Sequence, residues 1–150
     1  MSRTATYHTS VRWMGEHWGQ LTTGNGCEVK FSAPPDAHGH AGVLTPEDAF
    51  VAAANTCVML VFIWSAERFK IKLLAYECRA EGTKRIEIDR TEVFSRLHFR
   101  PLIRVAADGE ERAAVETRVR RAIQAAQKYS LVANSVKSEI AIDPEIVIEV

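Results

Sequence analysis

The chain has 150 residues, of which 47% are hydrophobic and 25% are charged, so we expect one folded globular domain over residues 1–150. Its formal net charge is zero and no block of Lys and Arg stands out, which argues against a nucleic-acid or membrane-surface partner. Three cysteines without a CxxC pair, and an N-terminus without an apolar signal region, favour a reducing, cytoplasmic setting. The longest apolar run, 49–64, is shorter than the roughly 20 residues of a membrane span.

The first third of the chain predicts β-strands. Apolar and polar residues alternate over 7–13 and again over 27–32, and the intervening TTGNG has turn chemistry. A loop rich in Pro, Gly and His follows over 33–43. Its two histidines, His38 and His40, have no third ligand at a diagnostic spacing, so we interpret them as solvated loop residues and predict no metal site.

A long apolar helix is predicted next. Thr45 is a good N-cap, Pro46 fits the first helical position, and Asp48 can close a capping box with Thr45. From Ala49 to Trp64 the helix is apolar on all sides. Such a helix must be buried on every side, either inside one subunit or between two.

The second half of the chain alternates strands and helices. We predict strands over 74–80 and 91–105 around a turn region at 81–90, and a final strand over 146–150. Asp108 and Glu111 form a second predicted capping box, which opens an amphipathic helix. The apolar stripe of that helix comprises Val115, Val119, Ala122, Ala126 and Tyr129. A short segment over 130–138 follows it. Strands grouped between helices favour the α+β class.

The three cysteines differ in their surroundings. Cys27 and Cys78 fall on the apolar faces of predicted strands, where a cysteine acts as a small hydrophobic residue. Cys57 lies in the apolar helix beside small residues, and Asn55 and Thr56 bring polar groups close to it. A thiol needs a cation, a helix N-terminus or hydrogen bonds to ionise, so Cys57 is the candidate reactive thiol.

The sequence TPED at 45–48, the sequence AAA at 52–54 and Cys57 together resemble the OsmC/Ohr family, the osmotically inducible and organic hydroperoxide resistance proteins. The glycine-rich loop before the helix, the later amphipathic helix and the segment AQKYSLVANSVKSEI extend the resemblance over most of the chain. The resemblance implies an intertwined homodimer in which antiparallel sheets wrap long central helices. It also implies reduction of small organic hydroperoxides by a peroxidatic cysteine, Cys57, with no metal or prosthetic group.

The family places a Glu ten residues before its reactive cysteine, as Glu47 precedes Cys57. Ten residues of helix rise about 15 Å, so the two side chains cannot meet on one straight helix. Antiparallel packing of two such helices about a two-fold axis could bring Glu47 of one subunit to Cys57 of the other.

The sequence departs from the family pattern at two places. The family's resolving cysteine corresponds here to Ser130, which can cap the following short helix but cannot form a disulfide. An oxidised Cys57 would then need an external thiol reductant, or Cys27 or Cys78. The family also uses an arginine to hold the thiolate, and we find four candidates for that role, namely Arg12, His17, His38 and His40.

Two functions follow from these observations. The first is a one-cysteine hydroperoxide reductase in which Glu47 orients a cation beside Cys57. Apolar residues such as Phe50, Val58 and Phe62 would favour alkyl peroxides over hydrogen peroxide. The second is a non-catalytic small-molecule-binding or scaffold dimer, which the substitution at the resolving position favours.

Overall fold

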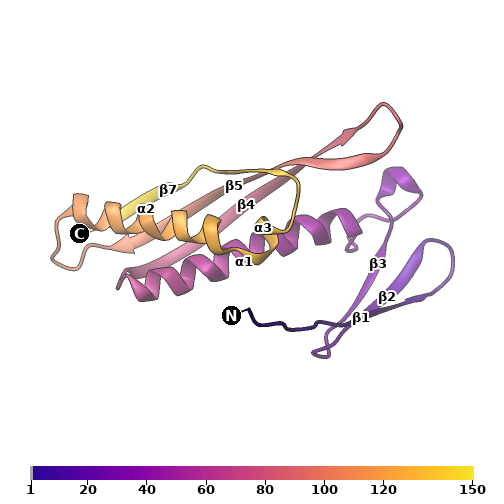
Figure 1. Ribbon diagram of the computed structural model, residues 1–150, viewed down its shortest axis with the longest axis horizontal. Coiled ribbons are helices and arrows are strands. Elements are labelled where there is room, and N and C mark those ends of the chain that lie inside the picture. Colours follow the sequence, from indigo (N-terminus) through magenta and orange to yellow (C-terminus); the bar gives the residue numbers. More distant parts are fainter. Residues whose placement is uncertain (1) are drawn as a thin grey trace. The chain divides into compact units, whose positions relative to one another are not determined.

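The computed structural model describes residues 2–150 and confirms the α+β class. Packing divides the chain into two compact units, Met1–Phe50 and Val51–Val150, and the long helix α1 (Pro46–Arg68) begins in the first and continues into the second. Figure 1 shows the strands and helices of each unit.

The first unit contains a three-stranded antiparallel sheet in the order β1-β2-β3. Its strands are β1 (Thr9–Trp13), β2 (Trp18–Thr23) and β3 (Glu28–Ser32). The sequence predicted the outer two strands but not β2, because Gly19 interrupts the alternation of side chains in this segment. An added Cβ at Gly19 would lie 2.3 Å from the ring of Phe31, so the ring would have to shift to admit a side chain. Part of the expected turn therefore belongs to β2.

The loop between β3 and α1 is held by several hydrogen bonds. It contains a short 3-10 helix, η1 (Pro35–Ala37). Ser32 is fully buried, its N–H donates to the Leu44 carbonyl at 3.0 Å, and its Oγ accepts from the His40 N–H at 3.1 Å. At Gly39 an added Cβ would lie 1.5 Å from the Ala33 carbonyl oxygen, so no side chain fits. The loop thus fixes where the chain enters α1.

Helix α1 begins at Pro46, as predicted. Thr45 Oγ1 accepts from the Asp48 N–H at 3.1 Å and donates to Asp48 Oδ2 at 2.9 Å. These two bonds confirm that Thr45 and Asp48 cap the helix, which satisfies one of the N–H groups that a helix N-terminus leaves free.

The other end of α1 is a Schellman motif. Lys70 has a left-handed backbone with φ of 57°, its N–H donates to the Glu67 carbonyl at 3.1 Å, and the Ile71 N–H donates to the Ala66 carbonyl at 2.8 Å. Ile71 and Ala66 are both buried, which supplies the apolar contact that usually accompanies this motif. The helix therefore extends four residues beyond the apolar run that predicted it.

The second unit is built on a mixed sheet. Its strands are β4 (Lys72–Ile86), β5 (Glu92–Ala106), β6 (Glu139–Ile142) and β7 (Glu145–Glu149). β4 and β5 form a long antiparallel hairpin, whereas β6 and β7 pair with β5 in parallel. The expectation of antiparallel sheets therefore holds for the first sheet and the hairpin only. A long connection through helices allows the parallel pairing. The turn expected at 81–90 was also wrong in part, since β4 continues to Ile86.

The second sheet has one apolar face and one charged face. The side chains of β5 that lie on the apolar face are fully buried, namely Leu97, Phe99, Ile103 and Val105. On the opposite face Arg100 pairs with Glu81 and Arg104 pairs with Glu149. Burial of only one face explains the clean alternation that predicted this strand from sequence.

Two helices of the second unit lie after β5. Helix α2 (Arg112–Tyr129) contacts β7, and α3 (Leu131–Asn134) is a single turn. The predicted capping box was wrong, because Asp108 lies in a tight turn with φ of 52° and the N-cap Glu111 makes no side-chain cap bond. The predicted stripe of α2 is buried except for Tyr129, which is 63% exposed, and Ile123 is buried beside it.

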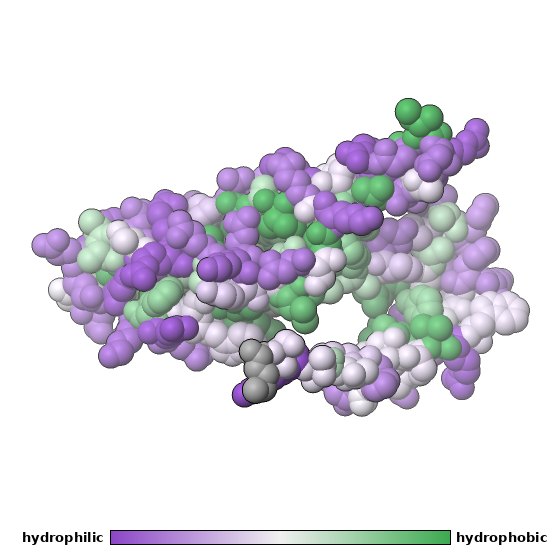
Figure 2. Space-filling view, viewed as in Figure 1, coloured by the Kyte–Doolittle hydropathy of each residue, from purple (hydrophilic) through white to green (hydrophobic). Residues whose placement is uncertain are grey.

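Several apolar side chains remain exposed in the second unit, and two groups of them matter here. One is the tip of the β4–β5 hairpin, where Ile86 and Ile88 are exposed and where Figure 2 shows hydrophobic atoms. The other is one side of α1, where Leu60 and Trp64 are exposed. By length and composition α1 also qualifies as a membrane span, but the core helix of a globular protein passes the same test.

Candidate functional site

Cys57 is a half-buried free thiol in the middle of α1. Leu60 and Trp64, three and seven residues further on, share its side of the helix and are 43% and 61% exposed. Cys57 therefore borders the side of α1 that this chain leaves uncovered. Val58 and Phe62, which the sequence suggested as the lining of the thiol pocket, are buried in the core instead.

Glu47 lies in the first turn of α1, where the helix dipole favours a carboxylate. Its Oε1 atom is buried and has no hydrogen-bond partner within the described chain. A buried carboxylate oxygen without a donor costs about 1–3 kcal/mol or more. The carboxylate is therefore suited to a partner that lies outside the described residues of this chain.

Ser130 is the N-cap of α3, as the sequence predicted, and it is fully buried. Its Oγ accepts from the Ala133 N–H at 3.4 Å, a long hydrogen bond that stabilises the start of α3 only weakly. Its proximity to Cys57 is untested and stays a prediction.

The candidate cations all belong to the first unit. Arg12 is an exposed residue of β1. His17 stacks on His38, with ring centroids 6.0 Å apart, and His40 stacks on Trp18 at 4.2 Å. None of them bonds the buried Glu47 oxygen in this chain. Across residues 2–150 there is also no group of three or more His, Cys, Asp or Glu side chains that could hold a metal ion.

Cys27 and Cys78 differ from each other more than the sequence suggested. Cys27 is exposed in the turn between β2 and β3, so its assignment to a buried strand face was wrong. The turn hydrogen bond from the Cys27 N–H to Thr23 Oγ1 at 3.0 Å explains its position just outside β3. Cys78 is half-buried on β4. Burial raises the pKa of the Cys78 thiol, and the neighbouring Tyr76 hydroxyl partly offsets the rise.

A polar cluster between α1 and β4 was not predicted as such. Asn55 Nδ2 donates to the Cys78 carbonyl at 3.2 Å. Asn55 Oδ1 and the Tyr76 hydroxyl are buried and have no hydrogen-bond partner among the described residues. Burial, and then the neighbouring Cys78, raises the pKa of Tyr76 above its ordinary value. The tilted ring of Phe62 covers Tyr76, with ring centroids 5.4 Å apart. The sequence signal that could have indicated this cluster is the single amide side chain, Asn55, within the apolar run 49–64.

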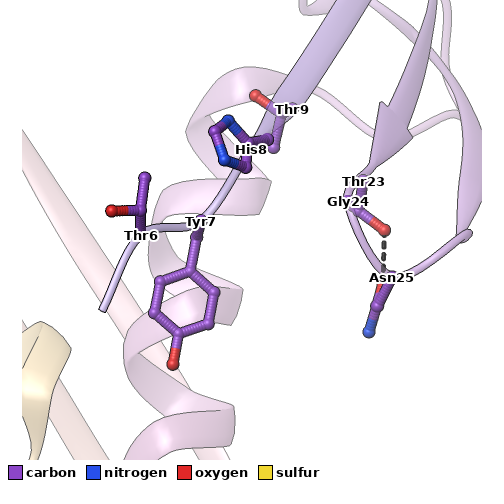
Figure 3. A pocket seen from close by; sticks show the side chains of 7 residues that line it. All are labelled: Thr6, Tyr7, His8, Thr9, Thr23, Gly24 and Asn25. Atoms are coloured by element: carbon purple, nitrogen blue, oxygen red, sulfur yellow. Dashed lines mark hydrogen bonds between the residues drawn. The ribbon is translucent and has the colours of Figure 1, made fainter.

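Several cavities lie in the first unit. One of about 520 Å³ is lined by Thr6, Tyr7, His8, Thr9, Thr23, Gly24 and Asn25. Figure 3 shows the N-terminal residues on one side of it and the turn at 23–25 on the other, and none of the predicted site residues contributes to it. Two apolar grooves, of about 180 and 370 Å³, share Val11, Phe31 and Pro46. Arg12 and His17 line the larger groove, so they lie at the start of α1, which carries Glu47.

Several solved structures match the fold of this chain over nearly its whole length. An OsmC-like protein of unknown function from Vibrio cholerae has a TM-score of 0.84 at 19% identity, covering 95% of this chain and 100% of that one. An OsmC-like protein from Mycoplasma pneumoniae has a TM-score of 0.79 at 13% identity, covering 97% and 99%. An organic hydroperoxide resistance protein from Elizabethkingia anophelis has a TM-score of 0.72 at 16% identity, covering 99% of each chain.

These identities are low, so the structural likeness establishes the fold alone. No curated protein sequence matches the chain significantly. The family described as OsmC-like protein matches residues 39–145, a range that includes α1 with Glu47 and Cys57 and also Ser130. This chain belongs to the OsmC-like protein family.

Proposed function

We propose that this protein reduces organic hydroperoxides through Cys57, as a homodimer that relies on an external thiol. The observation that carries the proposal is the free, half-buried thiol on α1 of an OsmC-like chain, ten residues after Glu47. Some structural neighbours are described as organic hydroperoxide resistance proteins, which supports the same chemistry.

Two features of the single chain support a homodimer. The side of α1 that bears Leu60 and Trp64 is apolar and exposed, and contact with a second copy would bury it. The buried oxygen of Glu47 has no donor within the described part of the chain, and a cation at a shared site would supply one. In this proposal Arg12 is the first candidate for that cation, because it is permanently charged and lines the groove at the start of α1.

The first chemical step would take place at the Cys57 sulfur. The thiolate attacks the terminal oxygen of the hydroperoxide, and the O–O bond breaks as the new S–O bond forms. The sulfur loses two electrons and becomes a sulfenic acid, while the alkoxide leaves and takes up a proton to give the alcohol. The cation held by Glu47 would favour the thiolate over the thiol. The apolar side chains of Leu60 and Trp64 would favour an alkyl substrate.

The second step would need a thiol from outside the chain. Ser130 has no sulfur, and helical spacing puts Cys57 nearly opposite Asn55, whose side chain bonds to β4 at Cys78. A reductant thiol would attack the sulfenic sulfur and release water, forming a mixed disulfide. A second thiol would then release the Cys57 thiolate and leave the reductant as a disulfide. A cytoplasmic setting would supply such thiols.

A non-catalytic binding or scaffold dimer is the second candidate. Two features favour it. Residue 130, which the family resemblance matches to the resolving cysteine, is a serine, and no cation bonds to Glu47 Oε1 among residues 2–150. Such a protein would keep the apolar surface near Cys57 and lose the redox chemistry.

Peroxide consumption separates the two functions. The purified protein is mixed with cumene hydroperoxide or hydrogen peroxide, with dithiothreitol, dihydrolipoamide or glutathione as reductant. We expect faster loss of cumene hydroperoxide, complete loss of activity in Cys57→Ser, and a dimedone adduct on Cys57 when no reductant is present. If neither peroxide oxidises Cys57, the binding-protein function holds instead. Light scattering at micromolar concentration tests the dimer, and a monodisperse monomer would contradict the shared site.

A further inference from the structure

Asn55 is a polar residue in the apolar part of α1, and its side chain bonds to the neighbouring strand. Its Nδ2 donates to the Cys78 carbonyl of β4 at 3.2 Å. An Asn inside a helix is less favourable than the alanines that precede it at 52–54. Its Oδ1 is also buried without a partner. Asn55 therefore adds little net stability, and its main effect is to fix a direction.

The Cys78 carbonyl is free to accept this bond because it points away from β5, the strand that pairs with β4. The Phe99 carbonyl accepts from the Asp143 N–H, and the Ala107 N–H donates to the Glu149 carbonyl. The odd-numbered residues of β5 between them therefore direct their backbone N–H and C=O groups toward β6 and β7, away from β4. Pro101 belongs to the same set and lies directly opposite Cys78. The Cys78 carbonyl therefore faces the outer edge of β4, where no strand of the described chain pairs.

The bond determines how α1 is rotated about its own axis. Successive helix residues are 100° apart, so Cys57 lies about 200° from Asn55, on nearly the opposite side. The residues that are fully buried against the sheet include Ala54 and Val58, beside Asn55 in the helical projection. Because α1 is apolar on all sides between Ala49 and Trp64, hydrophobicity alone distinguishes its rotations only weakly, and the bond adds a preference for one of them.

We propose that Asn55 is a positioning residue that fixes the rotation of α1 and thereby the direction in which Cys57 faces. The chemical meaning of this role rests on the proposed peroxidase function, but the geometric claim does not. The Asn55 amide satisfies an edge carbonyl, and the same bond directs Cys57 to the side of the helix where Leu60 and Trp64 are exposed.

Alkylation of Cys57 tests this inference without peroxide. The full-length protein and its Asn55→Leu and Asn55→Ala variants are treated with iodoacetamide over a range of pH, well below their melting temperatures. Trypsin separates the three thiols, because the fragments 13–30, 31–68 and 73–79 each contain one cysteine. Mass spectrometry then gives the alkylation rate of each thiol. Leu is close to Asn in size and favours the helix, so Asn55→Leu removes the donor while keeping the fold.

Ala54→Gly is the matched control. It loosens the helix at the adjacent buried residue and leaves the Asn55 amide in place. We expect both Asn55 variants to change the Cys57 rate or shift its pH profile by about threefold to tenfold, the size of one hydrogen bond's net effect on an equilibrium. Ala54→Gly destabilises the same part of the helix, and we expect it to leave the Cys57 profile within about twofold because the Asn55 bond is retained.

An unchanged Cys57 profile in both Asn55 variants would overturn the inference. An equal change in Ala54→Gly would overturn it too, because general loosening would then explain the effect. Failure of the proposed function has a different signature. The wild-type protein would then leave peroxide unconsumed while the Asn55 variants still altered alkylation of Cys57.

Discussion

Replacement of Glu47 by Gln tests whether a cation completes the proposed site. Glu47 Oε1 is buried without a partner among residues 2–150, and the proposed dimer supplies one. A hydrogen bond to a charged group stabilises by about 1.5–3 kcal/mol. Glu47 also lies in the first turn of α1, where the helix dipole contributes about 0.3–1 kcal/mol to a carboxylate. We therefore expect Glu47→Gln to lower the free energy of unfolding by about 2–4 kcal/mol.

The assay is urea unfolding at two protein concentrations, so that dissociation of a dimer shows as a shift of the midpoint. Glu67→Gln, at an exposed carboxylate on the same helix, is the control and should change stability by no more than about 0.5 kcal/mol. A change at Glu47 smaller than about 0.5 kcal/mol, or a gain in stability, would mean that the carboxylate has no cationic partner. That result would refute the shared site.

Four further predictions concern the thiols and the helix end. Ser130→Cys should form a disulfide with Cys57 on peroxide treatment, seen as the loss of two free thiols, and persistence of both thiols would show that residue 130 is not at the resolving position. Cys78→Ser should lower the free energy of unfolding by about 1 kcal/mol, whereas Cys27→Ser at an exposed turn should change it by less than about 0.5 kcal/mol in urea melts. Burial raises the folded-state pKa of Cys78, so the contribution of the neutral thiol to stability is complete below the unfolded thiol pKa of about 8.5 and is lost as pH rises further. The free energy of unfolding should therefore fall above that pH, and it should fall less in Cys78→Ser. Lys70→Gly should raise the free energy of unfolding by about 0.5–1 kcal/mol, since Gly relieves the left-handed backbone at φ of 57°, and a loss of stability would contradict the assigned strain.

Local chemistry accounts for what was predicted correctly. The N-cap at Thr45 depends on side chains within three residues of one another, and it formed as expected. The strand 91–105 was found within one residue at each end, because one buried face imposes a strict alternation. The cap at Ser130 was also correct for the same local reason. The capping box at Asp108 failed because a left-handed turn at that residue competed for the same segment.

Tertiary contacts account for what was missed. Strand β2 contains Gly19, which packs against the ring of Phe31 across the sheet, and no local pattern signals that contact. The burial of Cys27 was mistaken because the turn hydrogen bond to Thr23, rather than the alternation, set where β3 begins. Val58 and Phe62 were placed near the thiol by proximity in sequence, whereas the rotation of α1 turns them into the core.

The sequence by itself determined which residues have the chemistry for the site. It placed one thiol, Cys57, in an apolar helix after a carboxylate, and it left only a hydroxyl at residue 130. The tertiary structure decided which way that helix faces, because periodicity carries no direction when every side is apolar. The direction came from packing against β4 and from the bond between Asn55 and the Cys78 carbonyl, two residues that are 23 positions apart in the chain.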